Sequence, residues 1–115
     1  MSLLDIHVLG SPILRQETER VDTITPELRR LTDDMFDTMH AAKGVGLAAP
    51  QVGRRERLCV VQVDDTRLVM INPEIVKASE EKVMGVEGCL SVPNLVGEVE
   101  RHEAVQIKGL NRRGQ

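Results

Sequence analysis

The 115-residue sequence contains very few aromatic side chains: it has no tryptophan, no tyrosine and a single phenylalanine, Phe36. Proteins that bind single-stranded nucleic acid stack the bases on aromatic side chains, so this composition disfavours that class. The net charge is −3, which leaves no large basic field to attract nucleic acid or an anionic membrane. The sequence therefore predicts neither a direct nucleic-acid partner nor a membrane partner.

Cysteines and long apolar runs are also scarce. The two cysteines, Cys59 and Cys89, are too few for a disulfide framework, and unpaired thiols persist in the cytosol. The apolar runs are too short for a transmembrane helix. The N-terminal stretch is interrupted by Asp5 and His7 and has no basic leader, which disfavours a signal peptide. The sequence therefore predicts a cytoplasmic location.

The clearest predicted element is a helix that begins near Thr25 and ends near Gly44. Thr25 can cap its N-terminus, Pro26 suits its first turn, and Gly44 suits its C-cap. Apolar residues recur at three- and four-residue spacing and form one stripe, which consists of Leu28, Leu31, Met35, Met39 and Ala42. Such a stripe predicts that one face of the helix is buried.

Segments rich in β-branched and apolar residues predict strands at 57–63, 67–71, 74–78, 82–87, 97–102 and 104–110. A further short strand is expected at 3–9, followed by a turn in which Ser11 caps a helical segment that Pro12 begins. Hydrophobic residues make up 41% of the chain, enough for the core of one modest domain. We therefore predict a single α+β domain over residues 1–115, with the helix first and an antiparallel sheet after it.

The last residues, GLNRRGQ, carry a turn signal that follows a predicted strand. A hairpin needs a returning strand, and the sequence ends before one. This pattern predicts that the domain is truncated at its C-terminal side; the alternative is a frayed tail.

The stretch GVGLAAPQ, residues 44–51, is the first of two motifs. Gly44 and Gly46 leave the backbone open to close approach by a ligand. Gln51 carries an amide that can donate to an oxyanion. The alternative is a helix cap followed by a tight turn. The stretch is no dinucleotide fingerprint, because it follows a helix and its third glycine is missing.

The second motif, EGCLS at residues 87–91, contains Cys89 directly after a glycine. A buried structural cysteine does not need that glycine, whereas a thiolate that meets a ligand at close quarters can use it. Cys59 lies in an apolar predicted strand and is interpreted as a small core residue. From the residues alone, Cys89 is either structural or functional.

GVGLAAPQ followed about forty residues later by EGCLS resembles the peptide deformylase family, whose first two signature motifs these are. The likeness extends over LLDIHVLGSPILR at 3–15, DDMFDTM at 33–39 and MINPEI at 70–75. The resemblance implies a deformylase-like fold in which an N-terminal amphipathic helix packs on an antiparallel β-sheet, here without the family's C-terminal metal-binding helix. It also implies a metal-dependent hydrolase of protein biosynthesis, which removes the formyl group from the N-terminal formylmethionine of newly synthesised proteins.

The resemblance assigns roles to individual residues of this sequence. Cys89 would be a ligand of a divalent metal, with Fe²⁺ expected and Zn²⁺ or Ni²⁺ as the alternatives. The Gln51 amide and the Leu90 backbone N–H would form an oxyanion hole. Glu87 would be structural and paired with Arg101.

The same resemblance places the substrate. The peptide would extend along Gly44, Val45 and Gly46 as an added strand, and Gly88 would let its backbone lie against the second motif. The expected partners are N-formylmethionyl peptides of nascent chains, met in transient proximity to the ribosome. Apolar surface that lacks its cover would also make the chain self-associate.

The family's third motif, H-E-x-x-H, supplies two histidine ligands and the catalytic glutamate, and it does not occur in these 115 residues. The three histidines are His7, His40 and His102, and none has a second histidine four residues away. Two metal ligands are therefore missing, and activity of this chain alone is in doubt. The first interpretation is the N-terminal part of a deformylase. The alternative is a non-catalytic, deformylase-like module that binds peptides or another partner.

Overall fold

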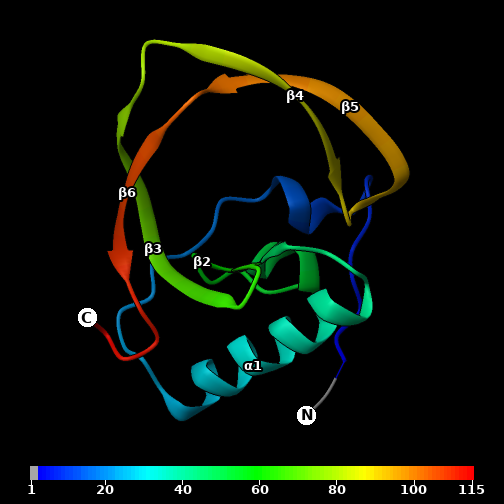
Figure 1. Ribbon diagram of the computed structural model, residues 1–115. Coiled ribbons are helices and arrows are strands. Elements are labelled where there is room, and N and C mark those ends of the chain that lie inside the picture. Colours follow the sequence, from blue (N-terminus) through cyan, green and yellow to red (C-terminus); the bar gives the residue numbers. More distant parts are fainter. Residues whose placement is uncertain (1–2) are drawn as a thin grey trace.

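A computed structural model describes residues 3–115, which form one helix and two antiparallel sheets (Figure 1). The four-stranded sheet has the order β1-β2-β3-β6, and the second sheet is the hairpin β4-β5. The elements are α1 (Pro26–Ala41), β1 (Gly46–Ala48), β2 (Leu58–Val63), β3 (Thr66–Ala78), β4 (Lys82–Cys89), β5 (Val92–His102) and β6 (Val105–Leu110), with short 3-10 helices at η1 (Pro12–Arg15) and η2 (Ala49–Val52). In Figure 1, α1 lies beneath β2 and β3, and β4 and β5 arch over the opposite side. The predicted α+β fold is confirmed.

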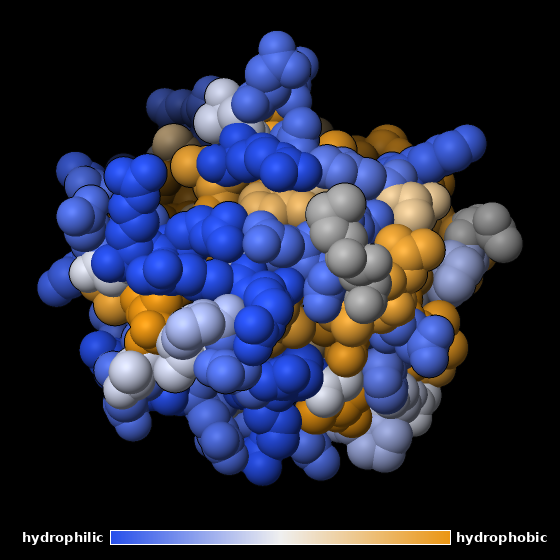
Figure 2. Space-filling view, turned by 90° about the horizontal axis from the view of Figure 1, so that it is seen from below, coloured by the Kyte–Doolittle hydropathy of each residue, from blue (hydrophilic) through white to orange (hydrophobic). Residues whose placement is uncertain are grey.

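The helix forms as its sequence predicts. Thr25 is the N-cap, and its Oγ1 accepts a hydrogen bond of 3.1 Å from the Leu28 N–H, while Pro26 occupies the first turn. The apolar stripe packs into a core with residues of the four-stranded sheet, among them Val60 and Ile71. Met35 and Met39 are completely buried. The outer face of α1 is polar, and Figure 2, which looks onto this side of the molecule, is mostly hydrophilic.

The C-terminus of the helix differs from the prediction, in which Gly44 was the C-cap. The helix ends at Ala41 and Ala42 is its C-cap. Lys43 adopts the left-handed conformation, with φ 62°, and the Gly44 N–H donates to the Met39 carbonyl at 2.9 Å. Glycine is favoured at position 44 for a different reason, which is its close packing against the Leu90 side chain of the second motif.

The N-terminal segment also differs from its prediction. Residues 3–9 form no strand, because their hydrogen bonds go to loops and single side chains instead of a neighbouring strand. The segment after it forms η1, with Pro12 in the first turn as expected. Ser11 precedes it without a side-chain capping bond; its hydroxyl lies 2.8 Å from the His7 Nδ1.

The predicted break at Asn72-Pro73 is a bulge within one long strand. β3 runs through it, and its register against β6 shifts between Ile71 and Glu74. Asn72 takes φ 55°, and its side chain makes two hydrogen bonds of 2.8 Å with the Val21 backbone. The polar side chain therefore fastens the segment before α1 to the sheet.

No helix within residues 3–115 is both long enough and apolar enough to cross a membrane.

Candidate active site

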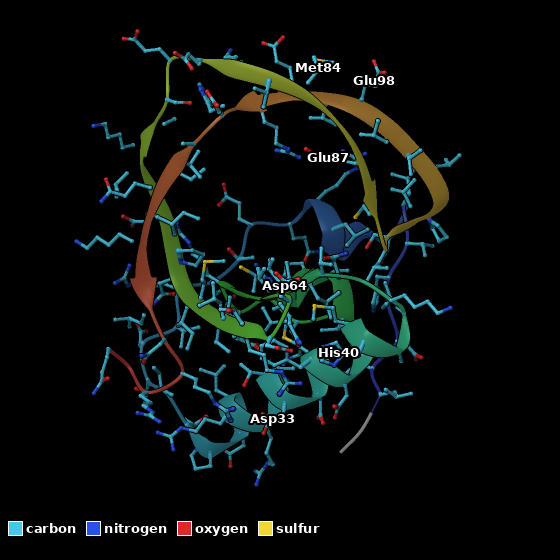
Figure 3. All side chains as sticks on the ribbon, viewed as in Figure 1. Asp33, His40, Asp64, Met84, Glu87 and Glu98 are labelled. Carbon is cyan, nitrogen blue, oxygen red and sulfur yellow. The ribbon has the colours of Figure 1, made fainter. Side chains whose placement is uncertain are left out.

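The second motif forms the tight turn of the β4-β5 hairpin. Cys89 ends β4, Val92 begins β5, and the two residues are paired across the turn that Leu90 and Ser91 make. The pairing register shifts between Gly88 and Cys89, so Cys89 lies just beyond the regular part of the ladder that contains Glu87. In Figure 3, Glu87 lies on the inner side of the arch, and Met84 and Glu98 lie on its outer side. The Cys89 thiol is thus held at one end of the arch, and the residue is exposed to solvent.

The first motif brings Gln51 to this thiol. β1 leads into η2, and within η2 the Gln51 side chain turns back so that its Oε1 accepts from the Ala48 N–H at 3.0 Å. The opposite end of the amide, Nε2, lies 3.7 Å from the Cys89 Sγ. Residues 38 positions apart therefore place an N–H donor beside a thiol.

Gly44 and Leu90 connect the two motifs by close packing. A Cβ atom on Gly44 would lie 2.6 Å from the Leu90 Cδ1, which is closer than two non-bonded carbon atoms approach, so the Leu90 side chain would have to shift. The Leu90 side chain packs against the main core at this point. Glycine at position 44 is therefore what allows the turn of the second motif to sit against the start of the first.

These residues line one open cleft with a volume of about 830 Å³. Seven of the nine predicted site residues contribute to it: Gly44, Val45, Gly46, Gln51, Gly88, Cys89 and Leu90. Beside it runs β1, which is the first strand in its sheet order and pairs with β2 alone. The cleft therefore has an exposed strand edge along one wall.

Glu87 and Arg101 lie outside this lining and form an ion pair across the hairpin. The Arg101 Nε donates to both carboxylate oxygens, at 2.9 and 2.7 Å, and a second nitrogen donates at 2.7 Å. The hydrogen bonds from Arg101 lower the pKa of the Glu87 carboxyl, partial desolvation opposes this, and the guanidinium charge lowers the pKa further. The carboxylate therefore stays ionised to a more acidic pH than an isolated glutamate.

Cys59 is placed very differently from Cys89. It lies within β2, between Ala48 of β1 and Met70 of β3, and is partly buried. Burial raises the pKa of the Cys59 thiol. Its environment matches a structural thiol that stays protonated.

The histidines do not gather at Cys89. His7 contacts the Ser11 hydroxyl, and the His40 Nε2 lies 2.6 Å from the Gln62 Oε1. His102 lies at the opposite end of the β4-β5 hairpin, where its Nδ1 is 2.6 Å from the Ser79 carbonyl oxygen. Across residues 3–115 no group of three His, Cys, Asp or Glu side chains could hold a metal ion. The donors of this chain therefore do not fit a complete metal centre; Cys89 is a single thiol beside an amide.

Sequence reasoning missed two contributions to this site. Ser91 is buried, and its Oγ accepts a hydrogen bond of 3.1 Å from the Gln51 Nε2. The backbone N–H groups of His7 and Leu9 donate to the carbonyls of Gln51 and Ser91, at 2.6 and 2.7 Å. Ser91 could have been singled out as the one polar side chain after Leu90 in the motif, but no sequence pattern indicated that residues 7–9 join the two motifs.

The cleft thus combines a strand edge that can pair with an extended peptide, an amide that can donate to an oxyanion, and an exposed thiol. The sequence profile of the family described as polypeptide deformylase matches residues 3–115. The chain belongs to the peptide deformylase family.

Individual relatives agree with this assignment. The chain is 46% identical to the peptide deformylase of Heliobacterium modesticaldum and 48% identical to peptide deformylase 1 of Clostridium acetobutylicum, and in each case it spans 76% of the relative's length. Its structure superposes on the peptide deformylase of Thermotoga maritima with a TM-score of 0.97 at 37% identity, over the whole of this chain and 78% of the other. The enzyme from Ehrlichia chaffeensis in complex with actinonin gives 0.97 at 38% identity, over 100% of this chain and 72% of the other. Members of this family are metal-dependent hydrolases that remove the N-terminal formyl group from newly made proteins.

Proposed function

We propose that these residues form the part of the deformylase site that binds the peptide and stabilises the oxyanion. The observation that carries the proposal is the 3.7 Å separation between the Gln51 Nε2 and the Cys89 Sγ. The two groups come from different motifs and meet in one cleft, as a shared chemical role requires.

Hydrolysis of the formyl amide turns its carbonyl oxygen into an oxyanion. The Gln51 side-chain amide and the Leu90 backbone N–H donate hydrogen bonds to this oxygen as its charge grows. A single donor of this kind contributes about 3 kcal/mol to transition-state stabilisation in a comparable hydrolase. Gln51 and Leu90 therefore act on the transition state more than on the bound peptide.

The substrate peptide extends along β1. Val45 is 69% exposed, and its carbonyl accepts from the Gln62 N–H at 2.9 Å, which fixes this segment on the sheet side. An extended peptide can pair with the other side of Gly44 to Gly46 by β-augmentation. Gly88 faces this path with no side chain of its own. The ion pair of Glu87 and Arg101 holds the hairpin that carries the cleft.

Cys89 is the metal ligand that this chain supplies. A thiolate is a soft donor that suits Fe²⁺, Zn²⁺ or Ni²⁺, and the family resemblance favours Fe²⁺. The described donors hold no metal alone, so no chemical step is assigned to the ion here.

The chain's partners follow from its substrate. N-formylmethionine begins new proteins, so the site meets nascent chains in the cytoplasm, in transient proximity to the ribosome. Direct contact with nucleic acid or a membrane has no support in a chain of net charge −3. The apolar side chains exposed on the arch favour association with a second copy.

A test of the catalytic proposal replaces Gln51 with alanine in the active protein that contains these 115 residues. We expect kcat for a formyl-peptide to fall about 100-fold, because one oxyanion donor is lost, while KM changes little. Gln62→Ala is the matched control, since Gln62 bonds His40 and Arg67 and lies outside the cleft lining. An unchanged kcat in Gln51→Ala would refute the proposal.

The second candidate is a deformylase-like module that binds peptides without catalysis. It is favoured by the absence of a group of three metal ligands within residues 3–115. Peptide binding without turnover by the 115-residue chain, and no turnover by any longer protein that contains it, would select this function.

A further inference from the structure

The Gln51 side chain is held at both ends of its amide. Its Oε1 accepts from the Ala48 N–H at 3.0 Å, and its Nε2 lies 3.1 Å from the Ser91 Oγ. A flipped amide would set the Gln51 NH₂ group against the Ala48 N–H, two donors facing each other. The orientation of the amide is therefore fixed by its hydrogen bonds.

The Ser91 Oγ accepts a hydrogen bond from one of the two protons on the Gln51 Nε2. A primary amide nitrogen carries two N–H donors. One is directed at the Ser91 Oγ at 3.1 Å, and Nε2 also lies 3.7 Å from the Cys89 Sγ. The second proton is thus the one available on the thiol side, where the formyl oxygen is proposed to sit.

The Ser91 hydroxyl is well suited to hold this orientation. The residue is 4% exposed, in a turn at the tip of an otherwise exposed hairpin, and a buried hydroxyl needs a hydrogen-bond partner. Its backbone is also fixed, because its carbonyl accepts from the Leu9 N–H at 2.7 Å. The Gln51 carbonyl is held in the same way by the His7 N–H, at 2.6 Å. Residues 7–9 therefore fasten the backbones of both partners.

We propose that Ser91 is a positioning residue for the oxyanion hole: its hydroxyl accepts one Gln51 Nε2 proton and so directs the other toward the reacting carbonyl. The inference rests on the proposed function of Gln51. Ser91 itself touches neither the substrate nor the reacting atoms, and it acts through the amide alone. Without the hydroxyl the amide is held only at its Oε1, by the Ala48 N–H, so the Nε2 end is less well fixed and the oxyanion donor is weakened but not removed.

The first test measures kinetics in the active protein that contains this chain. Ser91→Ala should lower kcat about tenfold with KM within twofold, and Ser91→Thr, which keeps a hydroxyl, should restore most of kcat. Ser79→Ala is the matched control, because that serine bonds the backbone of Glu81 and Ala104 at the far end of the β4-β5 hairpin. Unchanged kcat in Ser91→Ala, or no rescue by threonine, would overturn the inference.

A double-mutant cycle separates this inference from the proposed function. In a Gln51→Ala background, Ser91→Ala should lower kcat no further, since the amide on which it acts is gone. Additive losses would show that Ser91 acts independently of Gln51, and the inference would be wrong. If Gln51→Ala alone left kcat unchanged, the proposed function would fail instead.

A second readout needs no variant at the site. In the NMR spectrum of the 115-residue chain, the Gln51 side-chain proton bonded to Ser91 should exchange with solvent more slowly than the other, by a larger ratio than the two inequivalent amide protons of an unstructured glutamine peptide show. A ratio no larger than that of the peptide would overturn the inference, even if Ser91→Ala did not fold.

Discussion

Arg101 and Glu87 meet across the inner face of the β4-β5 hairpin, where the Arg101 Nε contacts both carboxylate oxygens of Glu87, at 2.7 and 2.9 Å. The two residues stand 14 positions apart, and the turn that carries Cys89 lies between them in the sequence. The ion pair thus closes the hairpin whose tip forms part of the cleft. Its partners are partly exposed, so its main effect is on local geometry.

The titration of Glu87 should report this contact. Because Arg101 lowers its pKa, the Glu87 carboxyl should titrate below the ordinary glutamate value of about 4.3, as measured by carboxyl NMR. The ion pair's contribution to stability is present above that ordinary value and is lost as the pH falls through the lowered pKa. Arg101→Gln should raise the Glu87 midpoint, whereas Lys82→Gln, on the pair with Glu100, should not. If the titration midpoint of Glu87 were the same in Arg101→Gln as in the unaltered protein, Arg101 would not be the cause of the lowered pKa.

Gly44→Ala should disturb the cleft by overpacking. Its Cβ would lie 2.6 Å from the Leu90 Cδ1, so the Leu90 side chain must move. We expect the free energy of unfolding to fall by about 1–3 kcal/mol, measured by denaturant titration, with shifted Leu90 methyl resonances. Gly85→Ala is the control, because no atom lies within 4 Å of the added Cβ there. Equal behaviour of the two variants would show that Gly44 has no special packing role.

Alanine variants of the two cysteines should differ in how much metal the protein retains. In the active protein that contains this chain, Cys89→Ala should abolish metal retention, because it removes the proposed ligand. Cys59→Ala should retain the metal and lower the free energy of unfolding by roughly 1 kcal/mol, since Cys59 lies inside β2. Elemental analysis with thermal unfolding distinguishes them, and equal metal loss in both would refute the ligand assignment.

The 115-residue chain by itself should give negligible turnover of formyl-peptides, even with added Fe²⁺ or Ni²⁺. Within residues 3–115 no three ligands come together, and no H-E-x-x-H motif supplies a glutamate to move the proton. Turnover near that of a complete family member would contradict this prediction. It would indicate that a second molecule supplies the missing metal ligands.

The isolated chain should also self-associate. Large apolar side chains are exposed on β4 and β5, including Met84 at 59%, Val86 at 69% and Val96 at 74%. Sedimentation at several concentrations should show an average mass that rises with concentration. Val86→Lys should weaken the association, and Val63→Lys, on β2, should not. A monomer at every concentration, with no hydrophobic dye bound, would mean that the exposed apolar residues do not drive self-association.

The predicted helix stripe does not contribute to that surface, and its predicted burial is confirmed. Leu28, Leu31, Met35 and Met39 are at most 7% exposed and pack on the chain's own sheet. Exposed apolar residues lie instead on the β4-β5 arch and also on the strands β2, β3 and β6. A stripe shows that a helix face is buried, but its period does not say which element covers it.

Most of the local structure and both motifs could be predicted from the sequence. The cap at Thr25, the helix stripe and the hairpin of β2 and β3 follow from local rules, because neighbouring residues along the chain decide them. The two motifs were recognisable because their glycines, glutamine and cysteine stand at fixed short spacings.

The tertiary structure alone decided how those motifs meet. Gln51 and Ser91 are 40 positions apart, and only the folded chain places one amide nitrogen 3.1 Å from a buried hydroxyl. Residues 3–9 look like a strand in sequence, yet their hydrogen bonds go to these loops, because the available partners are set by distant segments. Gly44 is predicted as a helix C-cap from its sequence position, but in the fold it is the close approach of the Leu90 side chain that favours glycine there. Long-range packing, which local propensity does not contain, fixes the geometry of the site.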